Sequence, residues 1–306
     1  MFTLAHLSDP HLPMPRARPV ELLGKRATGY VNWWRRRVRL HVPEALAGVV
    51  ADLAVQRPDH IALTGDLVNI SLPTEFQRAA DWLAALGRPD EVTVIPGNHD
   101  VYVATDWARS LGLWGAYLAG DGAPPAAGFE VFPTLRKRGP VALVGLSSGV
   151  PKPPLLATGT LGEAQIARAE RLLADLGGQG LCRVVLIHHP PLGSESRFKR
   201  LTDAAAFQAM IRRVGCELVL HGHNHRSEVA RIAGPTGPVP VLGVTSASAA
   251  PGSKYGRARY HLIRIVREAA GWRLDVELRA LRADGKGCEP DGRLTFHSGL
   301  PLAMVA

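Results

Sequence analysis

Five short polar clusters constrain this chain of 306 residues more than any other feature of its sequence. Each cluster contains Asp, Asn or His and directly follows an apolar, β-rich run. The clusters are Asp9-Pro10-His11, Gly65-Asp66-Leu67-Val68-Asn69, Pro96-Gly97-Asn98-His99-Asp100, His188-His189-Pro190-Pro191 and His221-Gly222-His223-Asn224-His225. Parallel strands end on one edge of a sheet, where the ligands of open α/β sheets gather, so we expect the clusters to converge in space.

Apolar runs and segments of helical periodicity alternate along the front of the chain and predict βα units. The expected strands are residues 2–7, 60–63, 92–95, 141–146, 184–187 and 218–220, and the expected helices are 43–56, 73–86, 105–118, 161–176 with Thr160 as N-cap, and 203–214. Beyond His225 the pattern is mostly β, with strands expected at 229–232, 239–244, 259–267 and 272–281. We predict a mixed α/β (α+β) fold and one domain over residues 1–306, in which the β-rich part from about residue 226 pairs with, or stacks on, the front sheet.

The clusters combine carboxylate, amide and imidazole donors. This mixture suits Mn, Fe, Zn or Co better than Ca or Mg alone. Seven candidate ligands exceed what one tetrahedral ion takes and match two divalent ions that share a bridging carboxylate. Two ions about 3.5–4 Å apart are the usual arrangement for in-line displacement at phosphorus. The sequence therefore predicts a dinuclear, metal-dependent phosphoester hydrolase.

The ordered set Asp9-x-His11, Gly65-Asp66-x-x-Asn69, Gly97-Asn98-His99-Asp100, His188-His189 and Gly222-His223-x-His225 resembles the signature of calcineurin-like metallophosphoesterases over residues 3–225. The resemblance implies a four-layer α/β/β/α sandwich of two mixed β-sheets flanked by helices. It also implies that Asp9, His11, Asp66 and His225 hold one metal ion. Asp66, Asn98, His188 and His223 would hold the other, with Asp66 bridging the two.

The same resemblance suggests roles next to the ligands. His99 would contact the phosphoryl group and protonate the leaving oxygen, and Asp100 would orient His99. Asn98, His99 and His189 are the candidate substrate-binding residues, with His189 supporting its ligand neighbour. Outside the ligand set, Asn69 is expected to anchor its loop and His221 to point away from the metals. The remaining histidines are interpreted as structural: His6, His41, His60, His261 and His297.

A basic aromatic insert at about residues 13–41 follows the first cluster. Between Arg16 and Arg39 eight Lys and Arg residues accompany the single acid Glu21, a net charge of +7 out of +9 for the chain. The stretch is expected to be irregular. One interpretation is a solvated basic loop or hairpin that covers the site. The other is a lid that meets an anionic lipid or membrane surface, because Tyr30, Trp33 and Trp34 stand beside Arg35–Arg37.

The leading hypothesis is a phosphodiesterase that uses a metal-bridging hydroxide for in-line attack on a small phosphoester or nucleotide-type substrate. The alternative is a membrane-associated pyrophosphohydrolase that acts on a nucleotide-linked lipid precursor such as UDP-diacylglucosamine. A non-catalytic scaffold is disfavoured because every expected ligand is present. Nucleic acid is an unlikely partner, since one short basic segment provides too small a surface to bind along the phosphate backbone of a duplex.

The cysteines and the hydropathy of the chain argue against disulfide-rich, zinc-ribbon, membrane-spanning and secreted proteins. Three separated cysteines, Cys182, Cys216 and Cys288, form neither a disulfide framework nor a zinc ribbon. No apolar run approaches the ~20 residues of a membrane span, and the N-terminus does not resemble a signal peptide. We expect a cytoplasmic protein, which the basic insert could hold at the inner face of the membrane. The sequence leaves the oligomeric state open.

Overall fold

A computed structural model describes residues 1–35, 37–192, 196–253 and 256–298. Two six-stranded mixed sheets lie face to face, in the orders β12-β11-β10-β1-β2-β3 and β4-β5-β6-β7-β9-β8. The strands are β1 (Phe2–Leu7), β2 (His60–Leu63), β3 (Val92–Val94), β4 (Thr134–Arg138), β5 (Val141–Gly145), β6 (Cys182–Leu186), β7 (Leu218–His221), β8 (Glu228–Ala233), β9 (Pro238–Gly243), β10 (Arg259–Glu268), β11 (Gly271–Leu281) and β12 (Cys288–Ser298).

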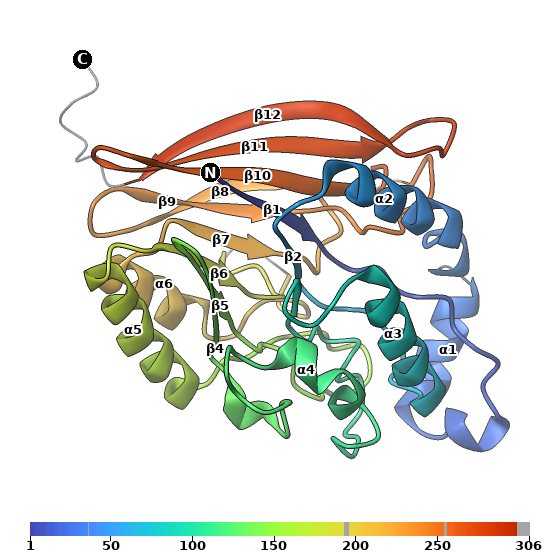
Figure 1. Cartoon of the computed structure of the whole chain (residues 1–306). Helices are drawn as coiled ribbons and strands as arrows, with labels where there is room; N and C mark the ends of the chain where they lie inside the picture. The colour runs from blue at the N-terminus through green and yellow to red at the C-terminus, as the bar shows by residue number, and fades with distance from the viewer. Residues whose placement is uncertain (36, 193–195, 254–255, 299–306) are drawn as a thin grey trace.

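Helices flank both sheets (Figure 1). They are α1 (Lys25–Arg35), α2 (Pro43–Gln56), α3 (Pro73–Leu86), α4 (Gly115–Leu118), α5 (Glu163–Gly178) and α6 (Ala204–Val214), with short 3-10 turns at Pro19–Leu22, Arg37–Arg39, Leu111–Trp114 and Phe129–Val131. Helices α5 and α6 cover the outer face of the second sheet, and α2 packs against β11 and β12 of the first. The predicted α/β/β/α sandwich is confirmed.

The alternation of side chains along the inner strands explains the layers. Leu218 and Leu220 of β7 belong to the core between the two sheets, together with Leu4 and Leu63 of the first sheet. The residue between them, Val219, points the other way and packs among residues of α5 and α6. Both faces of the second sheet are therefore buried, which accounts for its near-continuous apolar runs.

The order of strands brings the polar clusters together. Strands β1, β2 and β3 are mutually parallel in the first sheet, and β6 and β7 are parallel in the second. Their carboxyl ends lead into Asp9, Asp66, Asn98, His188 and His223, respectively. Strand β10 pairs antiparallel with β1, so the C-terminal strands extend the first sheet on its other side.

Two edge strands were not predicted from the sequence. Strands β4 and β12 each occupy the edge of a sheet. The first reads TLRKR, and the second includes Pro290 and Gly292 and is largely exposed. The buried residues of β4 are the polar Thr134 and Arg136, and β12 buries only Cys288 and Phe296. Neither strand therefore shows a hydrophobic alternation, and its pairing partner decides its structure.

Two helix predictions also differ from the structure. The segment 105–118 forms only a 3-10 turn and the four-residue α4. Helix α5 begins after Gly162 rather than after the predicted N-cap Thr160. The Thr160 hydroxyl instead makes a hydrogen bond of 2.7 Å with Thr202. A tertiary contact therefore competes with the local capping pattern.

The basic insert contains a helix, which corrects the expectation of an irregular loop. Helix α1 packs Tyr30 and Trp33 against a small apolar cluster that includes Ile70 and Leu72. Gly29 permits this approach, because a Cβ there would lie 2.7 Å from Ile70. The helix is further anchored by Arg26, whose guanidinium donates to the Ser71 carbonyl oxygen at 2.6 Å. Cationic side chains thus fix the segment through backbone carbonyls.

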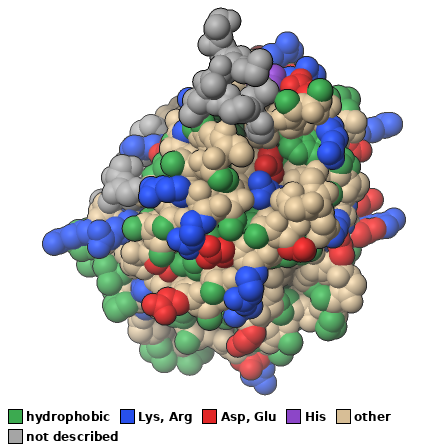
Figure 2. All heavy atoms as spheres, turned by 90° about the vertical axis from the view of Figure 1, so that its left-hand side faces the viewer, with side chains coloured by type: hydrophobic (Ala, Val, Ile, Leu, Met, Phe, Trp, Pro, Cys, Tyr) green, Lys and Arg blue, Asp and Glu red, His purple; other side chains and the backbone are tan. Residues whose placement is uncertain are grey.

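Charge is distributed unevenly over the surface. The face seen in Figure 2 lies on the side of α5, away from α1, and carries Lys and Arg interspersed with Asp and Glu. The excess of positive charge belongs to the insert. Within the described ranges, none of the helices has the length and apolar character that crossing a bilayer requires.

Candidate metal centre

The Asp66 carboxylate stands between two groups of donor atoms. Its Oδ2 lies 3.4 Å from Nε2 of His188 and 3.9 Å from Nε2 of His11. Its Oδ1 accepts a hydrogen bond of 2.7 Å from the backbone N–H of His99. Asp66 is buried, so its Oδ2 lies between His11 and His188 with little competition from water.

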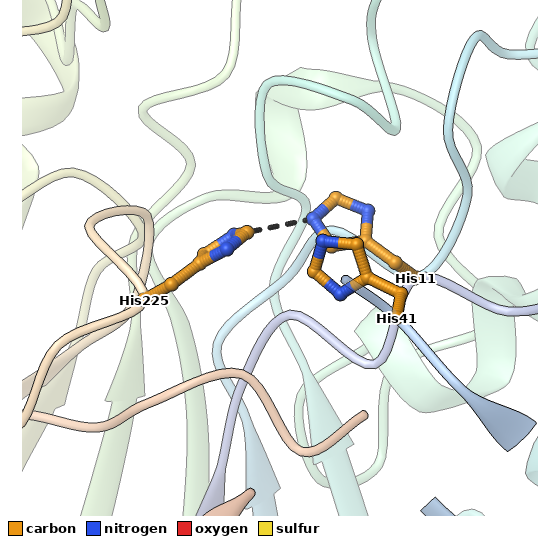
Figure 3. Close-up of side chains that lie close together, drawn as sticks. All are labelled: His11, His41 and His225. Atoms are coloured by element: carbon orange, nitrogen blue, oxygen red, sulfur yellow. Dashed lines mark hydrogen bonds between the residues drawn. The ribbon is translucent and has the colours of Figure 1, made fainter. Parts of the chain in front are cut away.

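The first group gathers around Asp9. Oδ1 of Asp9 lies 3.1 Å from Nε2 of His225 and 4.0 Å from Nε2 of His11. The Nε2 atoms of His11 and His225 are 3.3 Å apart and approach from opposite sides (Figure 3). With Asp66, these residues supply the four donors expected for one metal ion.

The second group gathers around the Asn98 amide. Oδ1 of Asn98 lies 3.1 Å from Nε2 of His188 and 2.8 Å from Nδ1 of His223. The structure thus brings together all seven predicted ligands: Asp9, His11, Asp66, Asn98, His188, His223 and His225.

Hydrogen bonds to backbone carbonyls orient the imidazoles. Nδ1 of His188 lies 2.6 Å from the Thr64 carbonyl oxygen, and Nδ1 of His11 lies 3.2 Å from that of Val68. Nε2 of His223 lies 2.9 Å from the carbonyl oxygen of Lys199. In each ring the nitrogen that faces the carbonyl must carry the proton, which leaves the other nitrogen as a lone-pair donor toward the centre.

Backbone conformation concentrates strain at the same residues. Among the described residues, eight non-glycine residues have positive φ, and five of them are predicted ligands: Asp9, His11, Asp66, His223 and His225. The left-handed region costs an L-residue roughly 1–2 kcal/mol, so such a concentration marks a functional site. Glycine permits the close contacts: a Cβ at Gly97 would collide with the Asp66 carboxylate, and one at Gly222 with Asp9.

The centre attracts positive charge. Burial opposes ionisation of Asp66, but the imidazoles around it, His188 foremost, hold its pKa well below the ordinary value. Burial likewise opposes a proton on His188, yet the Asp66 carboxylate outweighs it and raises the pKa of His188 to about 9. A position that favours a proton between these groups also favours a metal cation, which would displace that proton.

Comparison with known proteins agrees with this arrangement. The sequence profile named calcineurin-like phosphoesterase matches residues 2–227. The chain belongs to the calcineurin-like phosphoesterase family. It is therefore a metal-dependent phosphoester hydrolase of a dinuclear family, and its mixed oxygen and nitrogen donors fit that metal requirement.

The individual relatives share low to moderate sequence identity with this chain. Glycerophosphodiester phosphodiesterase GpdQ of Enterobacter lignolyticus is 28% identical over 235 residues, which cover 72% of this chain and 70% of the relative. A dimetal phosphatase from Danio rerio superposes with a TM-score of 0.61 at 13% identity, covering 97% and 98% of the two chains. A purple acid phosphatase from yellow lupin seeds also gives 0.61, at 14% identity, with 97% of this chain and 53% of that chain covered. The two structural likenesses support the fold.

Next to the ligands of this phosphoesterase, His99 is half-buried and its Nδ1 faces the Asn69 carbonyl oxygen. A guanidinium nitrogen of Arg37, from the insert, lies 3.4 Å from the same ring nitrogen. Burial, followed by the charge of Arg37, lowers the pKa of His99 to about 3. The ring is therefore neutral at pH 7, with Nε2 free of any partner within the described residues.

Asp100 does not act on His99, contrary to the sequence-based expectation. Its carboxylate accepts hydrogen bonds of 2.7–3.1 Å from the backbone N–H groups of Asp66, Leu67, Val68 and Gly97. Burial, with the nearby Asp66 charge, raises the pKa of Asp100 to about 7. Asp100 thus orders the loops that carry Asp66 and Asn98, and it touches no reacting group.

His41 lies at the centre, although its sequence context suggested a structural residue. Its ring packs 4.4 Å from that of His11 and 5.1 Å from that of His225 (Figure 3). Nδ1 lies within 3.1 Å of the hydroxyls of Ser246 and Ser248. These three histidines could themselves hold a metal ion. His41 was missed because it follows no strand and belongs to no cluster; only its tertiary position reveals it.

His189 is buried, with both ring nitrogens engaged by the protein. Nδ1 makes a hydrogen bond of 2.8 Å with Ser148, and Nε2 lies 3.2 Å from the Ala157 carbonyl oxygen. No ring nitrogen remains for a substrate, which argues against the predicted substrate-binding role. His189 instead packs against the rings of His188 and His223.

The other residues interpreted as structural lie away from the ligands. Asn69 donates to the Leu12 carbonyl oxygen at 2.8 Å and to Glu75 at 3.1 Å. His221 is buried with its ring 3.8 Å from the Glu228 carboxylate. Three further histidines pair with side chains of the sheet: His6 with His261, and His60 with Thr93. His297 pairs with Glu268 at the surface.

Replacing Asp100 with Ala tests its ordering role. The change leaves four buried backbone N–H groups without an acceptor, so we expect the free energy of unfolding to fall by at least about 3 kcal/mol. Urea unfolding measures the loss, and metal content should fall with it. Asp106→Ala is the control, since Asp106 is exposed and also accepts a backbone N–H. Equal stability of the two variants would contradict the role.

Proposed function

We propose that this protein is a phosphodiesterase that acts on small phosphodiesters. The observation that supports the proposal is a cavity of about 420 Å³, lined by Asn98, His99 and residues of α1, that adjoins the metal centre. A diester carries a second alcohol substituent that a monoester lacks, and this cavity offers it room. The relative named glycerophosphodiester phosphodiesterase points to the same class.

The ligand assignment is part of the proposal. Asp9, His11, Asp66 and His225 would hold one metal ion, and Asp66, Asn98, His188 and His223 would hold the other. Mn, Fe, Zn or Co suits this mixture of donors. When bound, such ions would supply an acidified water molecule and positive charge for the phosphoryl oxygens.

The protein's own groups position the substrate around these ions. His99 presents Nε2 to the phosphoryl group, because its Nδ1 is committed to the Asn69 carbonyl oxygen. Arg37 is half-buried beside it and adds a fixed positive charge for a phosphoryl oxygen. A bound phosphate anion raises the pKa of His99, so the ring takes up a proton with the substrate and donates it to the leaving oxygen.

Matched chromogenic esters test the diesterase proposal. Purified protein loaded with Mn²⁺, Fe²⁺, Zn²⁺ or Co²⁺ is assayed with bis(p-nitrophenyl) phosphate and with p-nitrophenyl phosphate, which share a leaving group. We expect kcat/KM for the diester to exceed that for the monoester by about tenfold or more, a difference of roughly 1.4 kcal/mol. Asp66→Ala should be inactive on both. A preference for the monoester would overturn the proposal.

Replacing His99 with Ala tests the proton donor. We expect both metal ions to remain and kcat to fall by about 10²–10⁴-fold on a diester with an aliphatic leaving alcohol. The loss should be smaller with a p-nitrophenyl ester, because p-nitrophenolate leaves without a proton. His297→Ala is the control. An equal loss on both esters would mean that His99 binds the phosphoryl group without donating a proton.

The lipid-linked pyrophosphohydrolase remains a second candidate, favoured by exposed apolar side chains on the insert. Leu23 is 73% exposed and Trp34 is 64% exposed, and the same insert carries the exposed basic residues Arg35 and Arg39. Such aromatic and cationic groups together suit an anionic membrane surface. Arg36, part of the same basic run, lies outside the described residues.

Vesicle sedimentation separates the two candidates. If the substrate is lipid-linked, the protein should bind vesicles that contain an anionic phospholipid and should hydrolyse UDP-diacylglucosamine presented in them. Replacing Leu23 and Trp34 together with Ser should then abolish sedimentation. Val55→Ser, which removes an exposed apolar group of α2, is the control. Absence of binding by the unaltered protein would remove this candidate.

A further inference from the structure

The cavity beside the metal centre has two ends. Asn32, Arg37, Asn98 and His99 line both this cavity and the one lined by Asp66 and His223, so the two cavities adjoin. Lys25 and Arg35 line only the outer cavity. Helix α1 therefore places cationic groups beyond the position where the reacting phosphoryl group binds.

The outer cavity carries positive charge. Lys25 and Arg35 line it, and no carboxylate does among the described residues. Arg35 is exposed and makes no hydrogen bond or ion pair within the described part of the chain. Cations gathered in a hollow without acids raise the local concentration of anions.

Lys25 is held in place without being neutralised. Its ammonium group lies 3.8 Å from the centroid of the Tyr102 ring and donates to the Tyr102 carbonyl oxygen at 2.8 Å. Partial burial lowers its pKa to about 8, so the group is still mostly charged at pH 7. One hydrogen bond to a carbonyl leaves two N–H donors of the ammonium group for a ligand.

We propose that this cavity binds a second phosphate group, carried by the alcohol substituent of the substrate. The inference rests on the proposed diesterase function and narrows its substrate to diesters with a further phosphate. Arg37 at the inner end serves the reacting phosphoryl group, whereas Lys25 and Arg35 at the outer end have no role in that reaction. An uncharged alcohol would use neither of these two cations.

Two diesters that differ only in the second phosphate test the inference. The first is the p-nitrophenyl ester of thymidine 5′-phosphate, and the second is the same compound with a 3′-phosphate. With the metal-loaded protein we expect kcat/KM to be at least about tenfold higher for the second, mainly through a lower KM, as for a charge-assisted hydrogen bond.

The variants locate the effect. Arg35→Gln should lower the ratio of kcat/KM between the two substrates. The double variant Lys25→Gln, Arg35→Gln should bring that ratio to about one. Arg39→Gln removes an exposed arginine of the same insert that does not line the cavity, and it should keep the ratio. The ratio is measured within each variant, so a general loss of activity does not mimic the result.

The outcomes separate this inference from the proposed function. Turnover of both esters at equal kcat/KM, or a preference that survives in the double variant, would overturn the second-phosphate site while leaving the diesterase intact. If the metal-loaded protein hydrolyses neither ester but does hydrolyse p-nitrophenyl phosphate, the diesterase proposal fails and this inference fails with it.

Discussion

The structure depends on gathering two groups of donor atoms around one buried carboxylate, Asp66. Its Oδ1 accepts the backbone N–H of His99, whereas His188 and His11 both approach Oδ2, from the ends of different strands. Five segments from two sheets must end at one place for this to happen. The parallel pairing of β1 with β2 and β3, and of β6 with β7, provides that common edge.

Holding the edge together requires backbone conformations that L-residues avoid, and buried carboxylates compensate for them. The loop after β2 contains Asp66, at a φ of 59°, and it is held from two directions. Asp100 accepts the N–H groups of Asp66, Leu67 and Val68. Glu75, at the start of α3, accepts those of Asn69, Ile70 and Leu72. These two buried carboxylates thus order the loop, and the ordered loop keeps the candidate ligands in place.

Much of the fold, and the convergence of the seven candidate ligands, could be predicted from the sequence, because both depend on local patterns. Apolar runs followed by Asp, Asn or His mark strand ends, and the parallel sheet brings those ends together. The residues that escaped prediction depend on tertiary contacts. His41 reaches the centre only because its backbone pairs with Ala249 and its ring rests on Ser246 and Ser248. Similarly, the actual partners of Asp100 are main-chain groups, which no side-chain pattern encodes.

The structure of the insert also depends on tertiary contacts that the sequence does not reveal. Its many basic residues are typical of a solvated loop, and no acidic residue opens α1. Packing of Tyr30 and Trp33 on the Ile70 cluster supplies the stability that local propensity lacks. One consequence is functional: helix α1 and the turn that follows it deliver Arg37 to His99 and line the outer cavity.

Anomalous X-ray scattering from crystals of the metal-loaded protein and of its Asp66→Ala variant tests the central claim most directly. We expect two peaks about 3.5–4 Å apart in the unaltered protein, one beside Asp9 and His225 and one beside Asn98 and His223, with Asp66 between them. Both peaks should vanish in the variant. A single ion, a pair remote from Asp66, or two ions retained after its removal would contradict the account.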